Sequence, residues 1–130
     1  MERKKVTIAE MQQKKEQGRK ISMMTAYDYP TARLVDEAGI DSILVGDSLA
    51  MVTLGYPSTV PVTMDEMLHH CRAVTRSPKA GFVIGDMPFL SYQVSIEKAI
   101  ENAGRFIKEA GCDAVKLEGG SEMAPVVRAV

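Results

Sequence analysis

Short apolar runs alternate along the chain with longer segments in which apolar residues recur every three or four positions. The runs are bounded by glycine, proline or aspartate, which is typical of buried β-strands, and they cover residues 21–26, 41–45, 81–85 and 112–117. The segments that follow them have the periodicity of amphipathic helices and cover residues 31–38, 63–75 and 96–110, with another beginning at residue 121. A further helix over residues 7–16 precedes the first strand.

Residues with helix-capping chemistry mark the predicted helix starts. Thr7 precedes Glu10 by three positions and Thr63 precedes Glu66 in the same way, so each pair predicts a capping box. Ser95 is expected to cap the helix over residues 96–110. The helical spacing predicts three buried faces, made by Leu34, Val35 and Ala38, by Met67, Leu68, Cys71 and Val74, and by Ile96, Ala99, Ile100, Ala103, Phe106 and Ile107.

One helix followed by four strand–helix pairs is half of a (β/α)8 TIM barrel, whose full form needs about 250 residues. We therefore expect an α/β fold in which residues 1–130 form the N-terminal half of a single barrel domain; a small doubly wound sheet is the alternative. An internal sequence similarity supports repeated strand–helix units, because EAGIDSILVGD (residues 37–47) resembles EAGCDAVKLEG (residues 109–119). Residues 49–61 are predicted to form a long polar loop, and long ordered loops are often functional.

Three predicted strands deliver a carboxylate at or just past their carboxyl ends: Asp47, Asp86 and Glu118. Successive acids lie about one strand–helix–strand unit apart, and parallel strands joined by helices all end at the same edge of a sheet. We therefore expect the three side chains to converge. Oxygen ligands suit a hard cation, so the pattern predicts a site for Mg²⁺ or a similar divalent ion. Taken singly, each acid also has the chemistry of a turn or helix cap.

Two further residues at these strand ends have chemistry that a site could use. Lys116 and Glu118 are two positions apart, so both project to the same side of a strand. Lys116 either forms a structural ion pair with Glu118 or holds an anionic substrate beside the metal. Ser48 either caps a turn or donates a hydrogen bond to a bound carboxylate.

Other suggestive residues are assigned to structural roles. His69 and His70 are adjacent on a helix, point about 100° apart and cannot chelate one ion together, so we expect surface or packing roles remote from the strand ends. The Gly119-Gly120-Ser121 turn is read as a plain tight turn, although a helix start can accept phosphate. The cysteines Cys71 and Cys112 lack short ligand spacing and are expected to be reduced thiols.

Composition excludes several classes of partner. The formal net charge is −1 and Trp is absent, so neither a basic field nor stacking platforms for nucleic acid are predicted. The N-terminal lysines alternate with acids and are read as a solvated helix face: Lys4, Lys5, Lys14 and Lys15. The N-terminus lacks a long apolar segment, so a cytoplasmic protein without a membrane anchor is expected.

Four long motifs resemble the ketopantoate hydroxymethyltransferase family: MMTAYDYP (residues 23–30), ILVGDSLAMVTLGYPSTVPVTMDEML (43–68), GDMPFLSY (85–92) and AGCDAVKLEGG (110–120). The resemblance covers nearly the whole chain and implies a (β/α)8 barrel in a homo-oligomer, decameric in the family, with Mg²⁺ or a similar divalent ion. It places the metal-associated acids at Asp47, Asp86 and Glu118. The residues that hold the ketoacid would be Asp47, Ser48, Asp86 and Lys116.

The resemblance also implies a reaction. The family transfers a one-carbon unit from 5,10-methylenetetrahydrofolate to 3-methyl-2-oxobutanoate, giving 2-dehydropantoate for pantothenate synthesis, through an enolate that the divalent ion stabilises. The general base of the family is a glutamate that would lie beyond Val130. Residues 1–130 are therefore expected to be catalytically silent alone, and the open sheet edges to favour self-association or pairing with a second half.

Two other readings compete with this one. A neighbouring Mg²⁺-dependent barrel of the phosphoenolpyruvate mutase and isocitrate lyase type would also act on an α-ketoacid. A half-barrel without catalytic function would need no response to Mg²⁺ and ketoacid.

Overall fold

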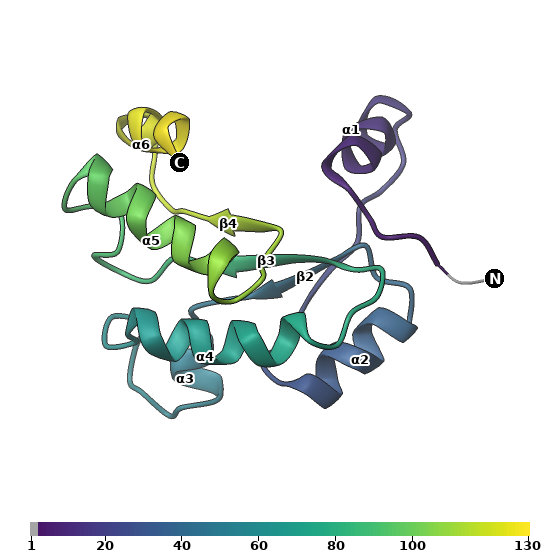
Figure 1. Ribbon diagram of the computed structural model, residues 1–130, viewed down its shortest axis with the longest axis horizontal. Coiled ribbons are helices and arrows are strands. Elements are labelled where there is room, and N and C mark those ends of the chain that lie inside the picture. Colours follow the sequence, from purple (N-terminus) through teal and green to yellow (C-terminus); the bar gives the residue numbers. More distant parts are fainter. Residues whose placement is uncertain (1–2) are drawn as a thin grey trace.

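Four parallel strands form a single sheet in the computed structural model, which describes residues 3–130 (Figure 1). The strands are β1 (Met23–Thr25), β2 (Ser42–Val45), β3 (Phe82–Asp86) and β4 (Ala114–Lys116), and their order in the sheet is that of the sequence. A doubly wound sheet reverses its strand order part-way, whereas successive barrel strands do not. The predicted half of a (β/α)8 barrel is therefore confirmed and the doubly wound alternative is wrong.

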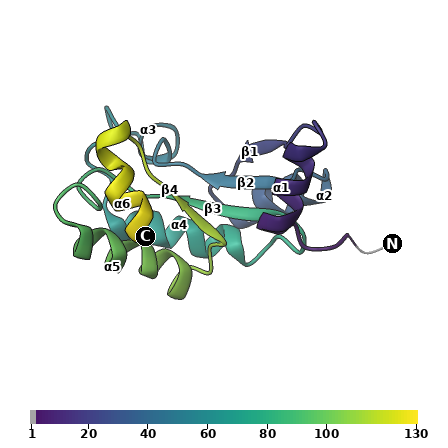
Figure 2. The same ribbon diagram turned by 90° about the horizontal axis from the view of Figure 1, so that it is seen from above.

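Six α-helices and one 3₁₀ turn accompany the sheet in residues 3–130. They are α1 (Ile8–Glu16), α2 (Tyr29–Glu37), α3 (Leu49–Val52), α4 (Met64–Thr75), α5 (Ile96–Lys108), η1 (Ser121–Met123) and α6 (Ala124–Ala129). Figure 2 shows α1 at the end where the strands begin and α3 and α6 at the end where they finish. None of the described helices is long and apolar enough to cross a membrane.

Local chemistry sets most of these boundaries. Thr7, Thr63 and Ser95 each accept a backbone hydrogen bond at the start of a helix, and the full capping box is present at Thr63. Strands β1, β2 and β4 are shorter than predicted, whereas β3 keeps its predicted length of five residues but lies one residue later. Residues 49–61 contain the short helix α3, so the prediction of an irregular loop is wrong there, and α2 begins two residues early because Asp28 caps it.

The core lies between the sheet and the helices α2, α4 and α5, of which α4 contacts both central strands. Ile43, Val45 and Val83 project from those strands and are almost fully buried. Gly85 lies where the ring of Phe106 crosses the sheet, and an added Cβ would stand 2.4 Å from the Cδ1 atom of Phe106. A side chain at that position would therefore push α5 off the sheet.

The predicted buried face of α4 is confirmed, but the faces of α2 and α5 are only partly so. Ala32 and Val35 of α2 are buried while Leu34 and Ala38 are exposed, and the three isoleucines of α5 lie at the surface. Both helices flank the edges of the sheet, where β1 is exposed throughout, so part of each apolar stripe stays exposed; on α5 the helix α6 covers its stripe only in part.

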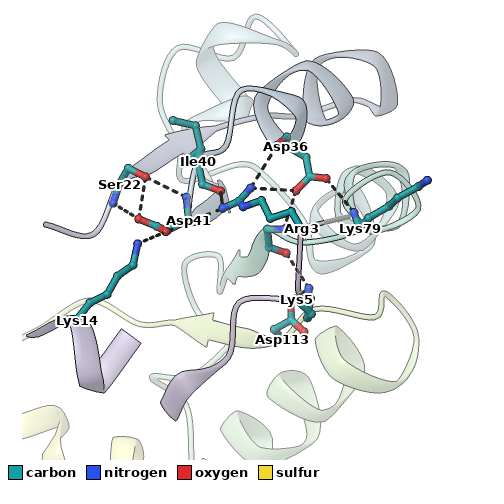
Figure 3. A network of polar contacts seen from close by, with 10 residues as sticks. Arg3, Lys5, Lys14, Ser22, Asp36, Ile40, Asp41, Lys79 and Asp113 are labelled. Carbon is teal, nitrogen blue, oxygen red and sulfur yellow. Dashed lines mark hydrogen bonds and ion pairs between the residues drawn. The ribbon is translucent and has the colours of Figure 1, made fainter. Parts of the chain in front are cut away.

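Ion pairs join the N-terminal segment to the starts of the strands (Figure 3). Asp41 is buried before β2, where it pairs with Lys14 of α1 and accepts hydrogen bonds from the backbone N–H (2.9 Å) and hydroxyl (3.0 Å) of Ser22. Lys5 pairs with Asp113 at 2.6 Å and also donates to the carbonyl of Gly81. The interpretation of these lysines as a solvated face is wrong for Lys14, whose side chain is largely buried against Asp41, whereas Lys5 is exposed but also pairs with Asp113.

We expect Asp41→Ala to lower the free energy of unfolding by about 2–4 kcal/mol, because it leaves a half-buried ammonium and a backbone N–H without their acceptor. Urea unfolding measures the change. The control is Asp65→Ala, which removes an exposed partner of Arg105 and should cost below about 1 kcal/mol. Equal losses in the two variants would show that the strand-start network is no stronger than a surface ion pair.

Candidate divalent-metal site at the carboxyl ends of the strands

The structure brings together the three acids at the ends of β2, β3 and β4. Asp86 is the last residue of β3, whereas Asp47 and Glu118 each follow their strand by two residues. One carboxylate oxygen from each lies within 4.8 Å of the other two. Asp86 is buried, Asp47 is half-buried and Glu118 is exposed, so the cluster opens to solvent on the side of Glu118.

Asp86 organises the cluster because both of its oxygens are engaged. Its Oδ2 accepts a hydrogen bond of 3.0 Å from the backbone N–H of Asp47, and its Oδ1 lies 2.8 Å from Nζ of Lys116. The same ammonium donates to Oε1 of Glu118 at 3.3 Å. Lys116 therefore bridges two of the three acids, so it does form the ion pair with Glu118 that the sequence suggested.

The charges of the cluster are incompletely neutralised. Burial and the neighbouring charges of Asp86 and Glu118 raise the pKa of Asp47 from 3.8 to about 6. Burial would lower the pKa of Lys116, but its ion pair with Asp86 outweighs that effect and the pKa is raised. Three carboxylates against one ammonium leave two negative charges at neutral pH, which is the charge that a divalent cation compensates.

Ser48 stands beside Asp47, at the start of α3. Its side chain makes no capping hydrogen bond to α3, and its Oγ lies 3.0 Å from the hydroxyl of Tyr27. Tyr27 follows β1, so four successive strand ends contribute to this edge of the sheet. Sequence reasoning missed Tyr27, although the residue lies within the MMTAYDYP motif.

The histidines and cysteines lie outside the acid cluster. Nδ1 of His70 is 2.7 Å from the backbone oxygen of Tyr27, so the prediction that His70 is remote from the strand ends is wrong, whereas His69 is exposed. Both cysteines are free and buried. The contact with Cys112, together with burial, raises the pKa of the Cys71 thiol, which keeps it protonated and unreactive.

The Gly119-Gly120 turn is occupied by its own chain. The backbone N–H of Gly120 donates to Oε1 of Glu122 at 2.9 Å, so a carboxylate already fills the place that a phosphate would take. The plain tight turn is therefore the better description.

Comparison with known proteins identifies the family. The family model for ketopantoate hydroxymethyltransferase matches residues 5–130. The chain belongs to this family. It is 60% identical over 129 residues to a 3-methyl-2-oxobutanoate hydroxymethyltransferase of Moorella thermoacetica, covering 99% of this chain and 48% of the relative. The enzyme of the same name from Heliobacterium modesticaldum is 60% identical over 127 residues, covering 98% of this chain and 46% of the relative. The chain thus spans about half the length of these curated relatives.

Solved structures with the same fold are more distant in sequence. Oxaloacetate acetylhydrolase matches 97% of this chain and 48% of its own, with a TM-score of 0.67 and 16% identity. Phosphonopyruvate hydrolase in complex with oxalate and Mg²⁺ matches 77% of this chain and 34% of its own, at a TM-score of 0.64 and 19% identity. A phosphoenolpyruvate phosphomutase of Streptomyces platensis subsp. rosaceus matches 73% of this chain and 32% of its own, with a TM-score of 0.61 and 22% identity. At such identities these matches show the fold alone.

Asp47→Asn should stabilise the metal-free protein. The pKa of Asp47 is raised in the folded state, so the stability linked to this group is present below about pH 4 and is lost as the pH rises through about 6. At pH 8 in EDTA we expect the Asn variant to melt about 2–4 °C above the wild type, with the gap closing at pH 4. Thermal melts across this range measure it. A gap that does not change with pH would contradict the assigned repulsion.

Proposed function

We propose that this chain is the N-terminal part of a (β/α)8 barrel enzyme that transfers a hydroxymethyl group from 5,10-methylenetetrahydrofolate to 3-methyl-2-oxobutanoate, giving 2-dehydropantoate. The observation that carries the proposal is the cluster of three carboxylates and one ammonium at the carboxyl ends of the strands, which is where barrel enzymes hold their substrates. Family membership supplies the reaction. We also infer that the protein acts in the cytoplasm as a homo-oligomer, as the family resemblance implies.

The donor set fits Mg²⁺ or a similar divalent ion. Its members are oxygen ligands at the ends of three separate strands, and the pKa of Asp47 is raised by burial and by the negative charges of Asp86 and Glu118. We assign Asp47, Asp86 and Glu118 to the ion. A divalent ion bound there supplies a Lewis acid for the oxygens of an α-ketoacid.

The remaining residues orient the ketoacid in this proposal. Lys116 presents its ammonium between two acids, where it neutralises a substrate carboxylate, and Ser48 donates its hydroxyl to the same group. We also assign Asp47 and Asp86 to the ketoacid site, because they lie in the same cluster as Lys116. The base that removes the C3 proton is assigned to a glutamate in the second half of the barrel, beyond Val130.

The competing reading, a mutase or lyase of the phosphoenolpyruvate mutase type, shares the fold with this chain. Its members match at 16–22% identity, whereas the hydroxymethyltransferases match at 60%. The family match favours hydroxymethyl transfer, and assaying the complete protein with both ketoacid and folate cosubstrate tests it. Cleavage of the ketoacid without folate would overturn the proposal.

The variant Lys116→Met tests whether Lys116 binds the ketoacid or only forms ion pairs with Asp86 and Glu118. Losing one charge-assisted hydrogen bond should weaken ketoacid binding about 10- to 100-fold, while divalent-ion affinity holds or improves because two acids lose their competing cation. Calorimetric titration of the complete protein with Mg²⁺ and with ketoacid measures both. Lys98→Met, which removes an exposed lysine paired with Glu101, is the matched control. Unchanged ketoacid binding with lower stability would make Lys116 a purely structural residue.

Residues 1–130 expressed alone should produce no 2-dehydropantoate, because the proposed base lies outside them. The product assay uses ketoacid, folate cosubstrate and Mg²⁺, with the complete protein as the positive control. Turnover by the isolated 130-residue chain would refute the placement of the base.

A further inference from the structure

Glu118 is the least constrained of the three clustered acids. Its side chain is 70% exposed, and its contact with Lys116 is shared with Asp86. Strand β4 ends at Lys116, whose carbonyl accepts a hydrogen bond of 3.0 Å from the backbone N–H of Met87. Gly119, the residue after Glu118, has φ +127, a conformation that favours glycine, so the chain leaves the direction of the strand immediately after Glu118.

A tyrosine from the preceding loop holds the backbone of Glu118. The hydroxyl of Tyr92 accepts the backbone N–H of Glu118 at 3.0 Å, and the Tyr92 ring is buried. This hydrogen bond lies between the end of β4 and the pair Gly119-Gly120. It therefore fixes the backbone from which the side chain of Glu118 projects. An exposed carboxylate with few neighbours takes its position mainly from its backbone.

The loop that carries Tyr92 contains a residue in an unfavourable backbone conformation. Leu90 has φ +66, a left-handed conformation that is unfavourable for a leucine. The turn around it is closed by Ser91, whose hydroxyl and N–H both donate to the carbonyl of Pro88 at 2.6 and 3.0 Å. The buried amide of Asn102 in α5 then donates to the carbonyl of Ser91 at 2.7 Å. The strained Leu90 and the hydrogen bond from Asn102 to Ser91 thus lie at the two residues immediately before Tyr92.

The geometry points to Tyr92 as a positioning residue for the divalent-ion site, acting through the backbone of Glu118, with Asn102 fixing the loop that presents it. This inference rests on the proposed function, because it requires that the three acids bind an ion. Tyr92 itself contacts neither the ion nor the substrate in this arrangement. Its removal is therefore expected to change the affinity for the ion and the exchange rate of the Glu118 amide proton.

The test compares Tyr92→Phe with Tyr56→Phe in the complete protein. Tyr56→Phe is a matched control, because it removes a hydroxyl that bonds Glu66 at the start of α4 rather than the cluster. Titration with Mn²⁺, followed by electron paramagnetic resonance of the free ion, should show affinity about three- to ten-fold weaker in Tyr92→Phe and unchanged in Tyr56→Phe. Equal affinity in Tyr92→Phe and wild type, or equal losses in both variants, would overturn the role.

A double-mutant cycle distinguishes positioning from general damage. In a Glu118→Gln background the ligand is already impaired, so adding Tyr92→Phe should cause no further loss of Mn²⁺ affinity. An undiminished further loss would overturn the proposal.

Hydrogen exchange of the Glu118 amide gives a metal-independent reading. Exchange should be faster in Tyr92→Phe than in wild type, and equal rates would show that the contact does not hold this backbone. If the wild type binds no Mn²⁺, the proposed function fails, and this exchange result then reports separately on the contact.

Discussion

Electrostatic repulsion among three carboxylates is the constraint on which this edge of the molecule depends. Parallel strands must all end at one edge, so acids at the ends of β2, β3 and β4 are forced within a few ångströms of one another. A folded chain tolerates this only with compensation, and Lys116 compensates one charge of the three. Burial of Asp47 and the neighbouring charges of Asp86 and Glu118 together raise its pKa to about 6. The same uncompensated charge that lowers stability is the charge that the proposed divalent cation would neutralise.

The opposite end of the sheet shows the contrast. There Asp36, Asp41 and Asp113 also gather, but Arg3, Lys5 and Lys14 pair with them and strand-start N–H groups donate to them (Figure 3). Acids at the strand starts are therefore satisfied and structural, whereas acids at the strand ends are not. This division follows the barrel rule that stability resides at one end and chemistry at the other.

Features encoded locally were predictable from the sequence, and features set by distant partners were not. Thr63 with Glu66 signals a capping box within one turn, and Gly-Asp at a strand end signals an exit from the sheet, so helices, strands and the acid cluster could be placed. The contact of Tyr92 with Glu118 joins residues of two successive units, and no local spacing signals it. The exposure of Leu34 depends on what lies beside an edge strand, which periodicity does not report.

Apolar side chains of the sheet lie next to the acid cluster and strengthen the electrostatic interactions among its charges. Side chains alternate along β3, so Ile84 and Asp86 share one face, and Leu44 lies beside Ile84 in the sheet register. Together with Met23 and the stem of Lys116, they line an apolar hollow. Apolar side chains border the cluster on that side in place of water, so the charges above them interact at a lower effective dielectric than in bulk solvent. The carboxylates and the ammonium at this edge therefore act on one another more strongly than the same charges would in water, and the apolar inner face of the sheet contributes to this effect without carrying a charge itself.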